Sequence, residues 1–142
     1  MATLHCVVAS PEGLVFEGDA RSVVVPAIDG ELGILPRHAP LIASLGQGEL
    51  RVKLAGASGG SGKAMARFFL EGGFVQVMKD QVMLLPTAAE SLDTMEVAAA
   101  EEKVRALVES RPDWHEPYEA REKHAERLRV AKLRAKLVQR RR

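Results

Sequence analysis

The sequence predicts an α+β fold in which a domain of short strands, a sandwich or a small barrel, precedes a pair of helices. All twelve glycines lie at or before Gly73, and five of the seven prolines lie at or before Pro86. Glycine and proline break helices and shape turns, so the first part of the chain favours strands and the last part favours helices. The spacing of apolar residues also changes after about residue 90, from alternation to a helical repeat.

The first 86 residues contain nine short segments that are rich in β-branched residues and bounded by turn residues. The predicted strands cover residues 5–9, 14–16, 21–25, 32–35, 41–45, 49–54, 66–71, 74–78 and 82–85. Nine short strands are typical of a sandwich or a small barrel. The intervening segment 55–64, AGASGGSGKA, is predicted to be a flexible hairpin tip because its side chains offer nothing to pack.

Two helices are predicted after the strands. The first runs from Asp93 to Ser110, with Asp93 and Glu96 in a capping-box pattern. The tripeptide 111–113, Arg-Pro-Asp, ends it because proline cannot continue a helix. The second is expected to start between residues 113 and 117, with Asp113 and Glu116 as a cap pair, and to run to the terminus. So short a connection favours an antiparallel hairpin.

Positive charge is concentrated at the end of the chain. The net charge is only +1, yet residues 113–142 hold ten basic and five acidic residues. An acidic partner is therefore expected for this helix, with nucleic acid and an anionic membrane as the general candidates. No aromatic residue that could stack on bases or anchor in lipid occurs between Glu119 and the terminus. The residues alone leave open a small β-domain whose basic helical arm binds nucleic acid, and also a merely solvated charged helix.

The residues do not indicate an enzyme or a metal site. A single cysteine, Cys6, lies in an apolar strand and is expected to fill the core. The four histidines lack metal-ligand spacing, and the glycine-rich segment 59–63 lacks the earlier glycine and the hydroxyl of a phosphate loop. No apolar run approaches the roughly 20 residues that span a bilayer, and the first residues lack a signal-peptide pattern. We therefore expect a cytoplasmic protein with no catalytic site, metal or cofactor.

Two motifs carry a family resemblance. The segment 29–41, DGELGILPRHAPL, and the segment 72–77, GGFVQV, occur in the order and spacing of one family. The chain resembles the epsilon subunits of bacterial F-type ATP synthases. The resemblance implies a β-sandwich of two five-stranded sheets over residues 1–87 and a helical hairpin over 88–142. It also implies a place in the central stalk, on the cytoplasmic face of the bacterial membrane, as a peripheral subunit that couples the rotor to proton-driven ATP synthesis.

The resemblance further implies partners and contact residues. The sandwich would bind the gamma subunit and the c-ring, with Glu31 facing the ring and His38, Pro40 and Leu41 in the contact region. The helices would regulate ATP hydrolysis by extending toward the alpha and beta subunits. The candidate contacts there are the basic residues Arg121, Arg127, Arg129, Lys132 and Arg134.

One departure from the family concerns nucleotide binding. Some members bind ATP through an Ile/Leu-Asp-x-x-Arg-Ala motif, of which Leu92 and Asp93 are present here. Glu96 and Val97 replace the arginine and the alanine. A carboxylate in place of a guanidinium would repel phosphate. We therefore predict no tight ATP binding by this chain and no cofactor.

Overall fold

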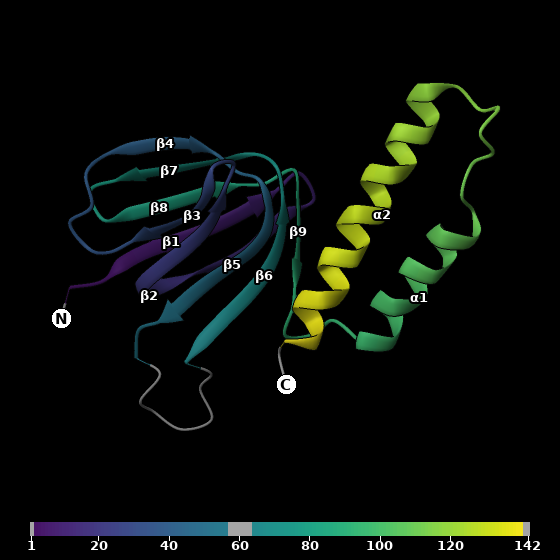
Figure 1. Ribbon diagram of the computed structural model, residues 1–142. Coiled ribbons are helices and arrows are strands. Elements are labelled where there is room, and N and C mark those ends of the chain that lie inside the picture. The colour runs from purple at the N-terminus through teal and green to yellow at the C-terminus, as the bar shows by residue number, and fades with distance from the viewer. Residues whose placement is uncertain (1, 57–63, 141–142) are drawn as a thin grey trace. The chain divides into compact units, whose positions relative to one another are not determined.

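The computed structural model describes residues 2–56 and 64–140, in two compact units, Met1–Ser91 and Leu92–Arg142 (Figure 1). The first unit is built of strands and the second of helices. The sequence placed this boundary after residue 87. The structure places it after residue 91 because a short strand, Ala88–Ser91, pairs with the strand Met65–Glu71 and so belongs to the first unit.

The first unit contains nine strands among the described residues. They are β1 (Leu4–Ser10), β2 (Gly13–Ala27), β3 (Gly30–Ile34), β4 (Leu41–Ser44), β5 (Gln47–Leu54), β6 (Met65–Glu71), β7 (Phe74–Met78), β8 (Gln81–Leu85) and β9 (Ala88–Ser91). β5 and β6 pair antiparallel on either side of the predicted hairpin tip, of which residues 57–63 lie outside the described residues. The strand β9 was not predicted, because its alanines and glutamate have low strand propensity.

Strand β2 joins the two layers of the sandwich. Its first half pairs with β1, and its second half pairs with β3 on one side and β5 on the other. The register shifts between Ala20 and Ser22, as at a β-bulge, which bends a strand. The two predicted strands 14–16 and 21–25 are therefore one strand of 15 residues.

The strands follow one hydrogen-bonded path, β4-β7-β8-β1-β2-β5-β6-β9, with β3 added to β2. A sandwich followed by two helices is confirmed. Two separate sheets of five strands are not found, because the shared strand β2 carries the hydrogen bonding from one layer into the other and the described residues form nine strands rather than ten.

The sandwich core comes largely from alternation of buried and more exposed residues along the strands. In β5, for example, Gly48, Leu50 and Val52 are buried, and the outward positions Glu49 and Arg51 between them are partly exposed, whereas in β6 the three consecutive residues 68–70 are all buried. Cys6 lies in this core as expected, and burial raises the pKa of its thiol to about 12. The same alternation therefore sends charged side chains to the outer face of the layer that contains β5.

The second unit is an antiparallel hairpin of α1 (Val97–Glu109) and α2 (Tyr118–Gln139), drawn side by side in Figure 1. The side-chain amide of Gln139 donates to the Glu101 carboxylate at 2.8 Å, which ties the end of α2 to the start of α1. The apolar stripe of α2 is buried, as its helical spacing requires. It comprises Leu128, Ala131, Ala135 and Val138.

The predicted start of the first helix is wrong, whereas that of the second lies at the edge of the expected range. α1 begins at Val97 instead of Asp93, after a turn in which Leu92 and Met95 are buried. α2 begins at Tyr118, after Pro117, whose fixed φ suits a position next to a helix start. The residues at the two N-cap positions, Glu96 and Pro117, make no side-chain cap hydrogen bond. Buried apolar residues precede the start of α1, and a proline precedes the start of α2.

Candidate functional site

The loop between β3 and β4 is held in place by the turn between β7 and β8. Lys79 and Asp80 form this two-residue turn with φ of 48° and 60°, the left-handed pair of a tight hairpin. The Asp80 carboxylate accepts the backbone N–H of Arg37 at 2.6 Å, and the Asp80 carbonyl accepts the N–H of His5 at 2.8 Å. One turn thus fastens both the loop and β1.

His38 lies within this loop and is turned toward its own backbone. Its N–H donates to the Leu35 carbonyl at 3.1 Å, and its Nδ1–H donates to the Ala39 carbonyl at 2.7 Å. Pro40 follows as an exposed residue directly before β4. The loop is therefore restrained by three hydrogen bonds, which the Arg37 N–H, the His38 N–H and the His38 imidazole donate. Pro36 and Pro40 restrict its backbone further.

An apolar face lies on the outside of β4, β7 and β8. Leu41, the first residue of β4, packs against the sandwich core, and the outward position belongs to its neighbour Ile42. Ile42 is 72% exposed and Phe74 is 59% exposed. Three further large apolar side chains on β7 and β8 are also exposed on this face, namely Met78, Met83 and Leu85. Large apolar residues grouped on one face mark an interaction surface more often than scattered ones do.

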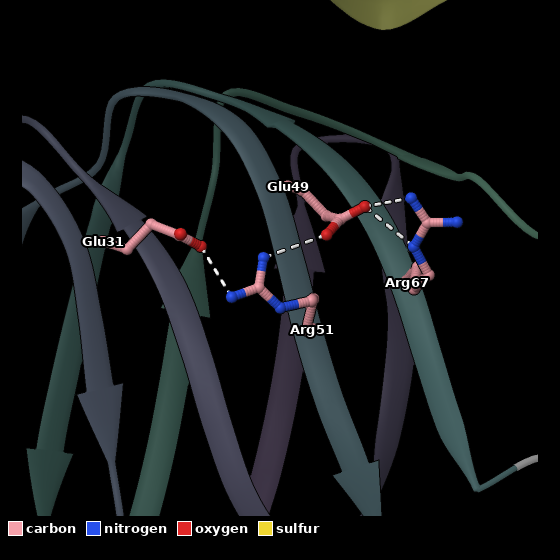
Figure 2. A network of polar contacts seen from close by, with 4 residues as sticks. All are labelled: Glu31, Glu49, Arg51 and Arg67. Carbon is pink, nitrogen blue, oxygen red and sulfur yellow. Dashed lines mark hydrogen bonds and ion pairs between the residues drawn. The ribbon is translucent and has the colours of Figure 1, made fainter. Parts of the chain in front are cut away.

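A ladder of four charged side chains crosses the outer face of the other layer, as Figure 2 shows. Glu31 on β3 pairs with Arg51 on β5 at 2.8 Å, and Arg51 also donates to Glu49 at 3.1 Å. Arg67 on β6 donates to Glu49 through Nε at 2.7 Å and through a second nitrogen. Arg51 and Arg67 are direct partners in the β5–β6 register, so Glu49 lies between two like charges.

Burial differs along the ladder. The side chains of Glu49 and Arg67 are only 10% and 14% exposed, whereas Arg51 is 33% and Glu31 is 58% exposed. The Glu49 hydrogen bond raises the pKa of Arg51, and the charge of Glu31 adds to the effect. The ladder therefore has a buried, charge-balanced end at β6 and an exposed carboxylate at β3. Sequence reasoning selected Glu31 from the motif but did not find the other three residues of the ladder.

A second polar cluster joins β1 and β2. His5 places Nδ1 3.1 Å from the Asp19 carboxylate and Nε2 2.9 Å from the Glu17 carboxylate. Hydrogen bonds to Asp19 and then to Glu17 raise the pKa of His5 above its ordinary value. The spacing of two between Glu17 and Asp19 was visible in the sequence, but the register that brings His5 of β1 beside them was not.

The five basic candidates of α2 do not share one face. Arg121 and Lys132 lie close in angle at 100° per residue, while Arg127 and Arg134 lie on a different side. Arg129 pairs with Glu126 one turn earlier. Arg134 is half-buried and the other four are exposed. The cations thus surround the helix outside its apolar stripe.

The partial nucleotide motif lies in the turn before α1. Leu92 is fully buried, Asp93 is half-buried, and Glu96 is exposed as the residue before the helix. Val97, the first helical residue, is half-buried. Among residues 2–56 and 64–140, no cluster of three histidine, cysteine or carboxylate side chains suits a metal ion. No helix in those ranges combines the length and the apolar character needed to cross a bilayer.

Comparison with known proteins links this geometry to one family. Residues 3–92 match the family described as ATP synthase, Delta/Epsilon chain, beta-sandwich domain. The chain is 44% identical over 100 residues to the ATP synthase epsilon chain of Halalkalibacterium halodurans, covering 70% of each chain. It is 33% identical to that of Dehalococcoides mccartyi strain BAV1 over 142 residues, which is 100% of this chain and 96% of the relative.

A solved structure shares the fold. A chain in the Euglena gracilis mitochondrial ATP synthase, in a structure of OSCP, F1 and the c-ring, superposes with a TM-score of 0.74 at 16% identity. The match covers 93% of the present chain and 79% of that one.

Proposed function

The chain belongs to the family of ATP synthase epsilon chains, and from this membership we propose that it couples the rotor of an F-type ATP synthase and regulates ATP hydrolysis without being catalytic itself. In this role it is a subunit of the central stalk. Its partners are the gamma subunit, the c-ring, and the alpha and beta subunits. The comparisons reported above offer no support for the alternative, a nucleic-acid-binding domain.

The apolar face of β4, β7 and β8 carries the proposal. Five large apolar side chains are between 43% and 72% exposed there, and covering them would contribute about 25 cal/mol per Å² of apolar area. The fixed loop that contains His38 and Pro40 leads directly into this face. A subunit that transmits torque needs a stiff contact, because a yielding one would dissipate rotation. We therefore assign this face, with His38 and Pro40 at its edge, to the gamma subunit.

Glu31 is the proposed contact with the c-ring. Its carboxylate is 58% exposed, and Arg51 holds it from below at 2.8 Å. A carboxylate that is already oriented loses less side-chain entropy on binding than a free one.

The helical unit is the proposed regulatory element. The cations Arg121, Arg127, Arg129, Lys132 and Arg134 lie on several sides of α2, as suits a helix inserted among acidic surfaces of alpha and beta. The assembled subunit would lie on the cytoplasmic face of the bacterial membrane as a peripheral component. It would bind no nucleotide tightly, because Glu96 and Val97 replace the arginine and alanine of the ATP motif.

Substitution of the apolar face tests the gamma contact. Ile42→Ser and Phe74→Ser change exposed side chains and should not affect folding, yet the double variant should lower the affinity for purified gamma by at least about tenfold. Met65→Ser is the matched control, because Met65 is 39% exposed on β6, which pairs with β5 and β9 and not with the strands of this face. Unchanged co-purification of the double variant with gamma would contradict the assignment.

Removal of the helices tests the regulatory role. A chain that ends at Ser91 keeps all nine strands and should still bind gamma and support ATP synthesis. Hydrolysis by the reconstituted complex should rise when residues 92–142 are absent. An equal rate of ATP hydrolysis with and without the helices would mean that the helices do not inhibit hydrolysis in this enzyme.

A further inference from the structure

The loop between β3 and β4 begins with a tight turn over residues 35–38, Leu-Pro-Arg-His. The Leu35 carbonyl accepts the His38 N–H at 3.1 Å, which is the hydrogen bond that closes a four-residue β-turn. Arg37 has a φ of 69°, and a positive φ directly after the proline is the pattern of a type II turn. Such turns prefer glycine at this position, because a side chain there is strained. The turn therefore holds an arginine where its own geometry favours glycine.

A second conformation of the same four residues suits arginine better. Type I turns accept most residues at the third position and also favour proline at the second, so the local sequence does not select type II. The two turns differ by a half rotation of the peptide plane between Pro36 and Arg37, and the φ of the third residue changes from about +80° to about −90°. In type I the Arg37 N–H therefore points to the opposite side. A contact that selects type II must act on this peptide group.

The Asp80 carboxylate makes that contact from the turn between β7 and β8. Its Oδ1 atom accepts the Arg37 N–H at 2.6 Å, although the two residues are 43 positions apart in the sequence. A hydrogen bond from a backbone N–H to a carboxylate is charge-assisted and about twice as strong as a neutral one. It requires the N–H to face Asp80, as it does in the type II orientation. One tertiary contact thus offsets the strain of a left-handed arginine.

The turn that contains Asp80 does not itself require a carboxylate. Lys79 and Asp80 have φ of 48° and 60°, and glycine is the commonest residue at the second position of such hairpin turns. The Asp80 backbone carbonyl accepts the His5 N–H, a contact that any residue at this position could make. The group that glycine would lack is the carboxylate, and the carboxylate meets Arg37. The contact to the loop therefore accounts for an aspartate where the hairpin favours glycine.

We propose that Asp80 is the positioning residue of the gamma-binding loop, because its carboxylate selects the type II turn at Pro36 and Arg37 and so fixes the surface that the loop presents beside β4. The inference rests on the proposed function, which assigns this edge to gamma. Without the carboxylate the turn would pass into type I, which reverses the peptide plane and redirects the Arg37 side chain. Gamma would then bind only the fraction of molecules that keep the type II turn, and its apparent affinity would fall by that fraction.

Substitution of Asp80 in the full chain tests the effect on gamma binding. Asp80→Gly removes the carboxylate but keeps the hairpin turn, because glycine adopts a positive φ freely. The affinity for purified gamma should fall by about tenfold. Asp80→Asn is the matched control, because its amide oxygen can still accept the Arg37 N–H and asparagine tolerates a left-handed φ. This variant should bind gamma within about threefold of the parent chain.

A second substitution separates positioning from a merely structural role. Glycine at position 37 adopts the type II turn without help. In a chain that already contains Arg37→Gly, the further change Asp80→Gly should therefore weaken gamma binding by less than about threefold. A general loss of folding caused by Asp80→Gly would not be rescued in this way.

Nuclear magnetic resonance of the full chain without gamma tests the turn directly. A strong nuclear Overhauser effect between the Pro36 Hα and the Arg37 amide hydrogen marks a type II turn. It should be present in the parent chain and in Asp80→Asn, and weak in Asp80→Gly.

The outcomes distinguish this inference from the proposed function. A type II turn that persists in Asp80→Gly would overturn the inference, and so would an unchanged gamma affinity or a loss that Arg37→Gly does not reduce. A parent chain that does not bind gamma, together with a turn that changes to type I in Asp80→Gly, would refute the gamma assignment and support Asp80 as the residue that positions the turn.

Discussion

The charge ladder makes a prediction about stability that centres on Glu49. Glu49→Gln keeps the shape of the side chain but removes its charge, which leaves Arg51 and Arg67 facing each other across β5 and β6. Breaking a buried ion pair by removing one partner costs about 3 to 5 kcal/mol, whereas exposed pairs contribute at most about 1 kcal/mol. Because Arg51 is one-third exposed and keeps Glu31, we expect a loss between these limits, of about 2 kcal/mol.

The assay is urea and thermal unfolding followed by circular dichroism. For a unit of this size, about 2 kcal/mol corresponds to a fall in Tm of about 10 °C. Glu31→Gln removes the same charge from the exposed end of the ladder and should cost less than about 1 kcal/mol. A double variant with methionine at both position 49 and position 67 should recover part of the loss, since two apolar groups leave no unpaired charge. The reasoning is refuted if Glu49→Gln is no more destabilising than Glu31→Gln.

Three further predictions follow from single contacts. Gly73→Ala should lower the Tm of the sandwich by at least about 10 °C, because the φ of Gly73 is 96° and a Cβ there would collide with the backbone at the end of β8. Gly33→Ala is the control: a Cβ at Gly33 meets open space, so its Tm should be unchanged. The carboxylates of Asp19 and Glu17 raise the pKa of His5 in the folded state, so the stability that His5 adds is fully present below its ordinary pKa of 6.5 and is lost as pH rises through the folded-state pKa. Urea midpoints of the parent chain and His5→Gln should therefore differ at pH 5.5 and converge by pH 8.5, and a constant difference would contradict this. Calorimetry should detect no sub-millimolar ATP affinity, because a carboxylate stands at the start of α1 where the motif requires a guanidinium.

Local patterns in the sequence were sufficient for the architecture. Alternating apolar residues predicted strands such as β7 and β8, and the helical repeat of apolar residues after about residue 90 predicted the two helices. These patterns work because burial acts on each residue through a fixed period of two or 3.6. They were less useful at the ends of elements. The first helix starts at Val97 and not at Asp93, because residues 92–95 form a turn in which Leu92 and Met95 are buried.

The motif over residues 29–41 identified the family and selected Glu31, but it did not determine what holds that residue. The chain alone fixes the residue types and their faces, so it determines a sandwich, a hairpin and a basic end. Which charges meet was decided only when strands far apart in sequence paired, since Arg51 reaches Glu31 and Glu49 reaches Arg67 through the registers of β2, β3, β5 and β6. The outward position of Ile42 and the Asp80 contact to the loop also depend on how the strands pair. A shift of one residue in register reverses every side chain of a strand, and that choice depends on the packed whole and not on the local sequence.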